Sequence, residues 1–523
     1  MILYDNWLRG HFYTPQASYI VTAFVIILLS RLLSRLLRRS LEADIPLINP
    51  KRRWEITKAG ARGRFLKNAR TMMHKAMVDY PGRPFRVYCG FGEVIMLPAE
   101  LINEIRNDNR FKFSLGPGPT LQYPGFEAAN RCIDDTGLFD VIKNDLTRHL
   151  GNMTEAITDA TGDAINRIFR DSTEWHDIPL KQDMLQLIGL VSSCQFVGEE
   201  LRGTDEWLKV SLDYANNIFV AAFFLGLVPP VLRPVVHWFI PQCRALRVAM
   251  RKARKITRGI LEKRRKENEE LAARGEPQVV SNDIFGWSEL RSGSQPHYDP
   301  AASLMALSIL ALHTTADLLC RTLLDLAERP ELVEELRLEM TKALSDKGWK
   351  MDAVHEMRLL DSVIKESMRL DPGALTSLSR VLEEEVRLSD GTVLPKGSQT
   401  LIPSYRQWNP AFYENPDVYD PYRFLRMRRE KDKEKSALLV STTENFTSFG
   451  HGVLACPGRF FAAVEIKIAL IHLLLGYDFR PASGYKRRNV CFDFVEQFDP
   501  DSKICMRMRR EFVDLHRFAR SQD

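Results

Sequence analysis

The length, charge and cysteine pattern of this sequence exclude several classes of protein. With 523 residues, 45% of them hydrophobic, the chain could form one large domain or two or three average ones. The net charge of +6 is small for this length and the basic residues do not alternate with aromatic ones, so we predict no nucleic-acid partner. The eight cysteines include no CxxC pair, which argues against a disulfide framework and a cysteine-rich zinc site.

The N-terminus contains an uncharged apolar stretch, Phe12 to Ser30, followed at once by a basic cluster that begins at Arg31. A stretch of this length can span a bilayer if it is slightly tilted. Positive charge accumulates on the cytoplasmic side of such a segment, so the rest of the chain is expected in the cytosol. We therefore predict a membrane anchor here, with a buried N-terminal helix as the alternative.

The middle of the chain combines short strands with long helical segments. The β-like runs on either side of Gly90-Phe-Gly92 predict a hairpin, and the prolines and glycines between Phe111 and Phe126 predict a long loop. Helical periodicity dominates from Val141 to about Ala273. Within that region Phe219 to Pro241 is apolar but interrupted by prolines, so it either dips into a membrane interface or forms buried core helices with a kinked connection.

A long apolar helix is predicted from Ala301 to Arg329, after the N-cap and first-turn pair Asp299-Pro300. At 1.5 Å per residue it would be on the order of 40 Å long and could cross a whole domain. Its polar insert, His313-Thr314-Thr315, is either functional or a satisfied core insert whose threonines bond back to the preceding turn.

One cysteine, Cys456, lies in surroundings that differ from those of the other seven. Gly450 and Gly452 precede it, Gly458 follows it, and an apolar helical run begins at Arg459. Glycines allow positive φ and a close approach to a flat partner, while a helix N-terminus stabilises a thiolate. This setting indicates a metal ligand or a nucleophile rather than a small buried hydrophobic side chain.

This loop resembles the haem-binding loop of cytochrome P450 monooxygenases, Phe-x-x-Gly-x-Arg-x-Cys-x-Gly. Phe449, Gly452, Cys456 and Gly458 match the pattern, whereas Leu454 stands where the family has Arg or His.

Three further motifs resemble the same family in order and spacing. Ala311 to Thr315 is similar to its central-helix motif Ala/Gly-Gly-x-Asp/Glu-Thr-Thr, with His313 at the acidic position. Glu366 and Arg369 match its Glu-x-x-Arg, and Asp420 to Phe424, which contains Arg423, resembles its Pro-Glu-Arg-Phe element. The four motifs together are hard to assemble by chance.

The resemblance implies a mainly α fold with small β-sheets, a long central helix over the haem and an N-terminal transmembrane helix. It implies an anchor and stop-transfer segment over residues 1–40 and a haem-thiolate catalytic domain over residues 41–523. The protein would then be a single-pass protein of the endoplasmic reticulum membrane whose catalytic domain faces the cytosol.

The resemblance also assigns roles to individual residues. Cys456 would bind the iron of haem b (iron protoporphyrin IX), in a loop shaped by Phe449, Gly450, Gly452 and Gly458. Thr314, with Thr315 beside it, would help to deliver protons to oxygen, while His313 either assists that relay or is structural. Glu366, Arg369 and Arg423 would hold the loop in place.

The haem propionates need cationic partners, and the resemblance assigns one of them to Arg380. Leu454 cannot donate such a bond. We therefore expect that one propionate contact is missing or is supplied by Lys143 or Arg148.

The resemblance predicts an oxidoreductase that uses O2 to hydroxylate or oxidise a lipophilic small molecule, a terpenoid or another polycyclic secondary metabolite of a fungal pathway. Because the sequence has no GxGxxG, electrons would come from NADPH through a membrane-bound cytochrome P450 reductase, with cytochrome b5 as a second candidate donor. Membrane lipids would be further partners. A haem-thiolate isomerase or dehydratase without a reductase, and a non-catalytic haem- or lipid-binding membrane protein, are the alternatives. The predicted pocket residues are Phe113, Phe219, Phe223, Ile309, Leu310, Ala311, Leu375 and Thr376.

Overall fold

The computed structural model describes residues 45–510, except for residues 56, 91, 116, 117, 135, 170, 171, 202, 203, 280 and 294–297. The predicted membrane anchor and its basic flank therefore lie outside the described residues. Most of the described chain is helical and the strands form small sheets, which confirms the predicted fold class. None of the eight cysteines, all of which lie in the described residues, forms a disulfide, which agrees with the prediction of no disulfide framework.

The elements have the following bounds. The α-helices are α3 Ala59–Asp79, α4 Ile102–Ile105, α5 Gly118–Leu121, α6 Glu127–Asp134, α7 Thr136–Asp140, α8 Thr147–Ile168, α9 Leu180–Val197, α10 Asp205–Leu227, α11 Arg233–Val236, α12 Pro241–Ala273, α13 Ile284–Ser292, α14 Pro300–Ala327, α15 Pro330–Lys347, α16 Met351–Glu356, α17 Arg358–Leu370, α18 Arg423–Met427 and α19 Arg459–Gly476. The strands are β1 Phe85–Cys89, β2 Gly92–Met96, β3 Phe111–Phe113, β4 His176–Pro179, β5 Thr376–Leu382, β6 Val386–Arg387, β7 Val393–Leu394, β8 Gln399–Pro403, β9 Tyr477–Pro481, β10 Asn489–Phe492, β11 Val495–Phe498 and β12 Lys503–Met508. A π-helical turn, η2 Val141–Leu146, joins α7 to α8, and 3-10 turns occur at η1 Ala99–Leu101, η3 Glu199–Leu201, η4 Pro230–Leu232, η5 Tyr405–Trp408 and η6 Lys435–Ala437.

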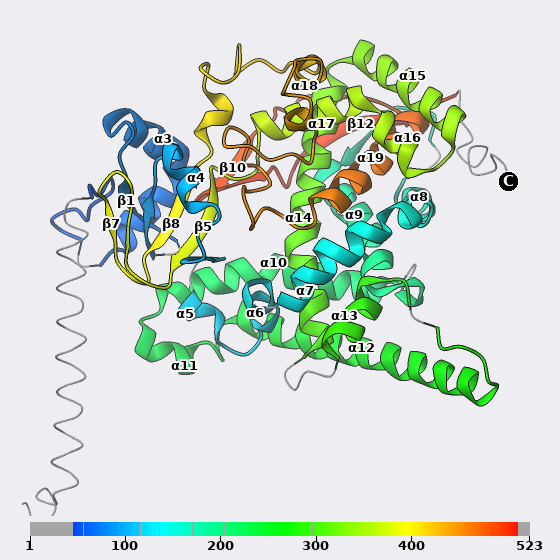
Figure 1. The fold of residues 1–523 in the computed structure, drawn as a ribbon, viewed down its shortest axis with the longest axis horizontal. Coiled ribbons are helices and arrows are strands. Elements are labelled where there is room, and N and C mark those ends of the chain that lie inside the picture. The colour runs from blue at the N-terminus through cyan, green and yellow to red at the C-terminus, as the bar shows by residue number, and fades with distance from the viewer. Residues whose placement is uncertain are drawn as a thin grey trace, which may run out of the picture.

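The largest sheet lies at one end of the molecule, on the left in Figure 1, and has the strand order β1-β2-β8-β5-β3. The predicted hairpin is confirmed, because β1 pairs antiparallel with β2 and Phe85 lies opposite Met96. The predicted loop from Phe111 to Phe126 is wrong at its start, since Phe111–Phe113 forms β3 and pairs with β5, and in its middle, where Gly118–Leu121 forms α5. That partner strand lies more than 260 residues later in the chain, so no local pattern could indicate the pairing.

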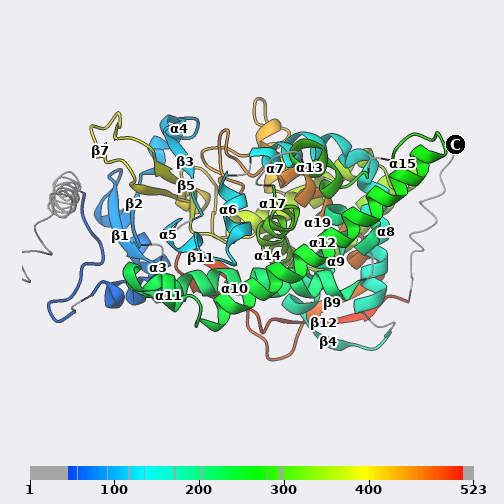
Figure 2. The same cartoon turned by 90° about the horizontal axis from the view of Figure 1, so that it is seen from below.

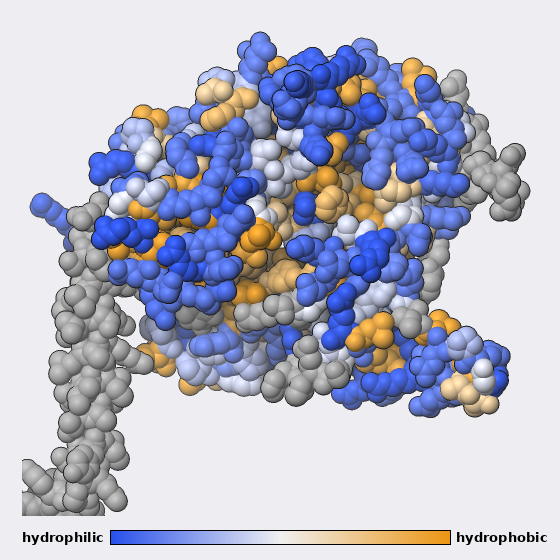
Figure 3. All heavy atoms as spheres, in the orientation of Figure 1, coloured by the Kyte–Doolittle hydropathy of each residue, from blue (hydrophilic) through white to orange (hydrophobic). Residues whose placement is uncertain are grey.

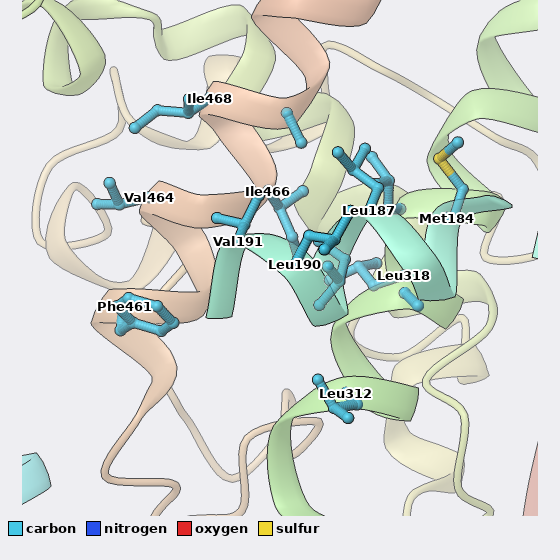
Figure 4. Close-up of a cluster of buried hydrophobic side chains, with 14 of the residues drawn as sticks. Met184, Leu187, Leu190, Val191, Leu312, Leu318, Phe461, Val464, Ile466 and Ile468 are labelled. Atoms are coloured by element: carbon cyan, nitrogen blue, oxygen red, sulfur yellow. The ribbon is translucent and has the colours of Figure 1, made fainter. Parts of the chain in front are cut away.

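The predicted long helix is α14, which begins and ends within two residues of the predicted bounds. Asp299 caps it as predicted, because its side chain accepts a hydrogen bond from the Ala302 N–H at 3.3 Å. Figures 1 and 2 show α14 running through the middle of the helical part of the molecule. It packs against α9, and α19 completes the same core, with buried leucine, isoleucine and valine side chains between the helices (Figure 4).

Two helices of the described part of the chain are long and apolar enough to cross a membrane. In α14, 78% of the most apolar window is buried inside the protein, so this helix belongs to the core. In α10 the corresponding share is 44%. The apolar residues from the end of α10 to the start of α12 are largely exposed, which contradicts the prediction of buried core helices for this region and favours the interface prediction. They are Phe219, Val220, Phe224, Leu227, Val231, Leu232, Val235, Trp238 and Phe239.

Candidate active site

The loop before α19 has the backbone conformation that its glycines allow. Gly450 and Gly452 have φ angles of 71° and 82°, in the region that other residues avoid. A Cβ atom on Gly452 would lie 2.6 Å from the Arg106 carbonyl oxygen, so no larger residue fits there. The Cys456 N–H donates to the Phe449 carbonyl at 2.7 Å and closes the loop. The predicted need for glycine is thus confirmed at both positions.

Opposing effects act on the thiol of Cys456. Burial raises its pKa, whereas hydrogen bonds from the backbone N–H groups of Gly458 and Arg459 and the charge of Arg459 lower it. These donors belong to the start of α19, where N–H groups lack helical partners. Gly458 itself has a φ of −83°, so positive φ is not needed there. The half-buried sulfur therefore has backbone donors that suit an anion, while burial keeps the pKa of the thiol above its ordinary value.

Thr314 is exposed although it lies in the middle of a helix that crosses the interior. Residues 301–309 are buried throughout, while Leu310, Ala311 and His313 are half-buried. The Thr314 hydroxyl donates back to the Leu310 carbonyl at 2.8 Å, as threonines in helices commonly do. Thr315, by contrast, is 4% exposed and faces the core. A hollow with hydrophobic residues at its floor opens in the middle of the face shown in Figure 3.

Arg380 is a buried cation in β5. It is 2% exposed, and its Nη1 donates to the Ser379 carbonyl at 2.9 Å. Within the described residues, its Nε and Nη2 have no hydrogen-bond partner. Burial lowers its pKa to about 10. Because a buried guanidinium is costly without a counter-ion, these free donors indicate a place for an anionic group. β5 is irregular at this point, with a register shift between Ser377 and Arg380.

Glu366, Arg369 and Arg423 form the predicted network. Arg369 donates Nε and Nη2 to the two carboxylate oxygens of Glu366, each at 2.8 Å, and both side chains are completely buried. Arg423 Nε completes the network at 3.1 Å from Glu366 Oε2. The bidentate pair lies within α17, and the contact from Arg423, the first residue of α18, joins α18 to α17.

Gln407 connects this network to the cysteine loop, and the sequence did not indicate it. Arg369 Nη1 donates to the Gln407 carbonyl at 2.6 Å. The side-chain oxygen of Gln407 in turn accepts from the Thr447 N–H at 3.0 Å and from the Ser448 hydroxyl at 2.9 Å. Thr447 and Ser448 directly precede the loop. The side chain of Gln407 therefore links the network of Glu366, Arg369 and Arg423 to the segment that carries Cys456.

Leu454 is 43% exposed and makes no polar contact with its side chain. The two predicted substitutes, Lys143 and Arg148, are also exposed, on η2 and the first turn of α8. Ile142, next to Lys143, contacts the cysteine loop, since its Cγ2 lies 3.8 Å from where a Cβ on Gly458 would be. The π-helical turn η2 therefore packs against the loop at Ile142, the residue before Lys143.

A further cation near the loop, Arg106, was missed. Its Nη1 lies 2.9 Å from Nε2 of His451, which is 8% exposed and contacts the Thr442 hydroxyl through Nδ1 at 3.2 Å. Burial lowers the pKa of His451, and the charge of Arg106 lowers it further, so this histidine is the acceptor. Arg106 follows α4 in a stretch of charged residues typical of a helix end, so no sequence pattern indicates its contact with the loop.

The predicted pocket residues differ in exposure. Phe113, Phe223, Leu310, Ala311 and Thr376 are half-buried, Ile309 and Leu375 are buried, and Phe219 is 50% exposed on α10. The ring of Phe223 lies 5.4 Å from the ring of Phe492 in β10, a contact that the sequence did not predict. Residues that line a hollow keep some exposure. The half-buried Leu310, Ala311 and Phe223 are therefore the better candidates for the lining of a substrate pocket.

The comparison with known families decides the class of the protein. A family model described as cytochrome P450 matches residues 140–495, more than half of the chain. The chain is a cytochrome P450. It is 38% identical over 470 residues to the cytochrome P450 monooxygenase hepE of Aspergillus oryzae, which covers 89% of this chain and 86% of that relative.

Other relatives cover the chain as fully. Cytochrome P450 monooxygenase 1 of Gibberella fujikuroi is 38% identical over 439 residues, 83% of this chain and 100% of the relative. The monooxygenase pyr3 of Aspergillus fumigatus is 33% identical over 523 residues, 98% of this chain and 97% of the relative. As a cytochrome P450 the protein is an oxidoreductase, a haem-thiolate monooxygenase, which confirms the predicted enzyme class.

We expect Leu454→Arg to increase haem affinity. An arginine here would add a charge-assisted hydrogen bond to a haem carboxylate, worth roughly 1 kcal/mol at a position as exposed as this one. Haem content per chain after expression, and haem loss to an excess of apomyoglobin, measure the effect. Val453→Arg, at the neighbouring 63% exposed position, is the matched control. Equal haem retention in both variants and the wild type would show that no contact is missing.

Proposed function

We propose that this cytochrome P450 is a single-pass protein of the endoplasmic reticulum membrane that oxidises a bulky lipophilic molecule, a terpenoid or another polycyclic secondary metabolite. The observation that carries the proposal is the exposure of Thr314 in the middle of a helix that is otherwise buried on its N-terminal side. The half-buried side chains next to it, Leu310 and Ala311, are apolar, so the space beside them suits a lipophile. The relatives are fungal monooxygenases, which supports a biosynthetic role.

The residues described above fit a haem. Cys456 would bind its iron through a sulfur that two backbone N–H groups already face, and the free donors of Arg380 would pair with a propionate. Bound haem supplies an iron that activates dioxygen with electrons from a reductase. Gly450 and Gly452 let the loop lie close to a flat partner, and the Glu366 network holds the loop. Arg106 and Lys143 are the candidates for the contact that Leu454 does not make.

Thr314 would position a proton on the oxygen side. Its hydroxyl donates to the Leu310 carbonyl at 2.8 Å, which leaves its oxygen free to accept a hydrogen bond from water. The proton that the hydroxyl passes on would thus be replaced from that water. Electrons would come from NADPH through a membrane-bound reductase, with cytochrome b5 as a second candidate donor.

The test uses the full chain in membranes together with a cytochrome P450 reductase. We expect NADPH-dependent conversion of a member of a terpenoid and polycyclic panel into a product heavier by one oxygen atom, with label from ¹⁸O2. Conversion that proceeds without NADPH would replace this proposal with the isomerase or dehydratase alternative. Binding of haem without turnover of any lipophile, despite electron supply, would favour the non-catalytic alternative.

Thr314→Ala should separate NADPH consumption from product formation. We expect product formation to fall by about 10²-fold, the lower end of what a positioned proton donor contributes, because water can partly replace the hydroxyl. NADPH consumption should continue, with reduced oxygen species as the outlet. Ser308→Ala is the control, since the Ser308 hydroxyl also bonds back along α14, to the Leu304 carbonyl, but is buried. Full coupling in Thr314→Ala would remove Thr314 from the proposed chemistry.

The exposed apolar residues between α10 and α12 are proposed to lie in the membrane interface. Trp238 and Phe239 are 54% and 78% exposed, and Arg247 packs on the Trp238 ring at 4.6 Å. An apolar surface flanked by basic side chains suits the boundary between acyl chains and headgroups. In vesicles containing brominated lipids, quenching of the tryptophan fluorescence should therefore decrease in Trp238→Phe. Trp287→Phe, which removes a buried tryptophan, should not lower the quenched fraction, because the lost emission was not accessible to the lipid quencher. Equal quenched fractions in the wild type and Trp238→Phe would place this surface in water.

A further inference from the structure

A groove outside the haem loop runs between α10 and α12, which pack against each other. Its volume is about 650 Å³, within the range of small-molecule sites, and valine side chains of both helices line part of it. Its polar lining consists of Asp213, Asn217, Arg244 and Lys252. The oxidation proposed above uses none of these residues, so the groove is a candidate for a second binding site.

One end of the groove carries the aromatic residues Trp238 and Phe239, which lie just before α12. They belong to the exposed apolar surface that we propose lies in the membrane interface. Arg247 holds Trp238 in place, because it donates to the Trp238 carbonyl at 3.1 Å and its guanidinium carbon lies 4.6 Å from the centre of the indole ring. This end of the groove therefore opens towards lipid.

Contacts at Gly125 show which residues of the two helices lie level with each other. The Tyr214 hydroxyl of α10 donates to the Gly125 carbonyl at 2.8 Å, and a Cβ atom on Gly125 would lie 3.1 Å from the backbone nitrogen of Arg247 in α12. The helices run antiparallel, since only the turns of residues 228–240 connect the end of α10 to the start of α12. Asp213, next to Tyr214, therefore lies level with the part of α12 around Arg247.

The charged side chains of the groove alternate in sign along its length. Arg244 lies nearest the aromatic end, and Lys252 lies eight residues further, about 12 Å along the helix. Asp213 lines the stretch between them from the side of α10. All three are exposed, and within the described residues none of them has an ion-pair partner. The groove therefore offers a cation, an anion and a second cation to a ligand.

This order of charges matches the headgroup of phosphatidylserine. The phosphate of that lipid lies next to the glycerol, and the serine beyond it carries an ammonium and a carboxylate. With the acyl chains beside Trp238 and Phe239, the phosphate would lie at Arg244. The ammonium would then reach Asp213, and the carboxylate would reach Lys252. Phosphatidylglycerol has only the phosphate charge and phosphatidylcholine has no carboxylate, so neither lipid uses all three side chains.

We propose that this groove binds phosphatidylserine of the cytoplasmic leaflet. Anionic lipids are characteristic of that leaflet, and it is the one on which the predicted topology places the catalytic domain. The proposal rests on the proposed position of Trp238 and Phe239 in the membrane interface, and it names the lipid that this surface recognises.

The alternative is the attraction of any anionic lipid to a basic helix. Residues 241–261 of α12 contain seven arginines and lysines and no acidic residue. Such a segment favours phosphatidylserine and phosphatidylglycerol equally, because each carries one net negative charge. Asp213 would oppose this general attraction, whereas it supports the binding of an ammonium. A comparison of the two lipids therefore separates a headgroup site from a basic surface.

The experiment places the full chain in phosphatidylcholine vesicles that contain a minor fraction of brominated phosphatidylserine or, in a parallel series, of brominated phosphatidylglycerol. The quenching of Trp238 is the quenched fluorescence of the wild type minus that of Trp238→Phe. We expect phosphatidylserine to be enriched at Trp238 about fivefold over phosphatidylglycerol, the effect of roughly one additional charge contact near a membrane surface. Equal enrichment of the two lipids would overturn the proposal.

Two groove variants and a matched control assign the preference to the groove, each measured with Trp238 and with Trp238→Phe. Asp213→Asn loses the contact with the ammonium and Lys252→Gln the contact with the carboxylate, so each should bring the two lipids close to equal enrichment. Lys255→Gln removes the same charge as Lys252→Gln from an exposed lysine of α12 outside the groove and should keep the preference. All three positions are exposed, so the variants should fold, and haem content checks this. A preference that persists in both groove variants, or that Lys255→Gln loses to the same extent, would contradict the assignment.

Brominated phosphatidylcholine separates this proposal from the one on which it rests. If no brominated lipid quenches Trp238, the surface lies in water, which contradicts both the interface position and the groove site. If brominated phosphatidylcholine quenches Trp238 while the two anionic lipids are equally enriched, the interface position stands and only the phosphatidylserine site fails. Neither outcome bears on the oxidation, which the product assay measures separately.

Discussion

Replacing Cys456 with alanine should abolish the red-shifted Soret band of the reduced carbon-monoxide complex and lower turnover to background. A methyl group cannot bind iron, and the described part of the chain contains no cluster of histidine, cysteine, aspartate or glutamate that could hold a metal ion instead. The free donors of Arg380 should still retain some haem, in a different spectral form. Difference spectroscopy of membranes that contain equal amounts of protein measures the effect.

Cys243→Ala is the control for this variant, because Cys243 is buried in α12 and burial raises its pKa. It should keep the spectrum and the activity, apart from the small cost of a lost core contact. A red-shifted band that persists in Cys456→Ala would mean that another side chain is the ligand and that the loop has a different role.

The second large effect is expected for Glu366→Ala. It would leave Arg369, which is completely buried, and Arg423 without their shared carboxylate. Removing one partner of such a buried pair costs about 3–5 kcal/mol in the free energy of unfolding. Arg369 bonds to Gln407, and Gln407 bonds to the residues that precede the cysteine loop. Haem content should therefore fall together with stability. Urea denaturation and haem absorbance, measured on the same samples, test both parts.

The position of the carboxylate, rather than the loss of a negative charge, should cause this effect. Glu331→Ala removes an exposed carboxylate from the first turn of α15 and should change the free energy of unfolding by less than about 0.5 kcal/mol. If Glu366→Ala were as stable as this control and fully loaded with haem, the network could not be what holds the loop.

Local chemistry made most of the scaffold predictable. The Gly90-Phe-Gly92 turn, the cap at Asp299 and the apolar run that became α14 are each decided by residues within a few positions of one another. The strand at Phe111 was not predictable in this way, because its pairing with β5 is the whole reason that it is a strand. The exposure of Trp238 and Phe239 was predicted as one of two outcomes, since an apolar sequence alone does not say what covers it.

The candidate site, too, was predictable only in part. Resemblance to a family supplied Cys456, Thr314 and the Glu366 network, and the structure brings the three network residues together. Gln407 and Arg106 are polar residue types that occur on any protein surface, and their partners are far away in sequence: His451 lies 345 residues after Arg106. Only the folded chain selects these contacts, which is why no spacing pattern indicates them.

The bridge through Gln407 also determines when a newly made chain can take up its cofactor. Thr447 and Ser448, just before the loop around Cys456, donate hydrogen bonds to the Gln407 side chain. The Gln407 carbonyl in turn accepts a hydrogen bond from Arg369. All of these contacts join segments from the last third of the sequence, and Thr314 is made before them. In a chain still being synthesised, Thr314 would therefore be present first and Cys456, the proposed iron ligand, last. Supply of haem must then match the release of finished chains rather than the start of their synthesis.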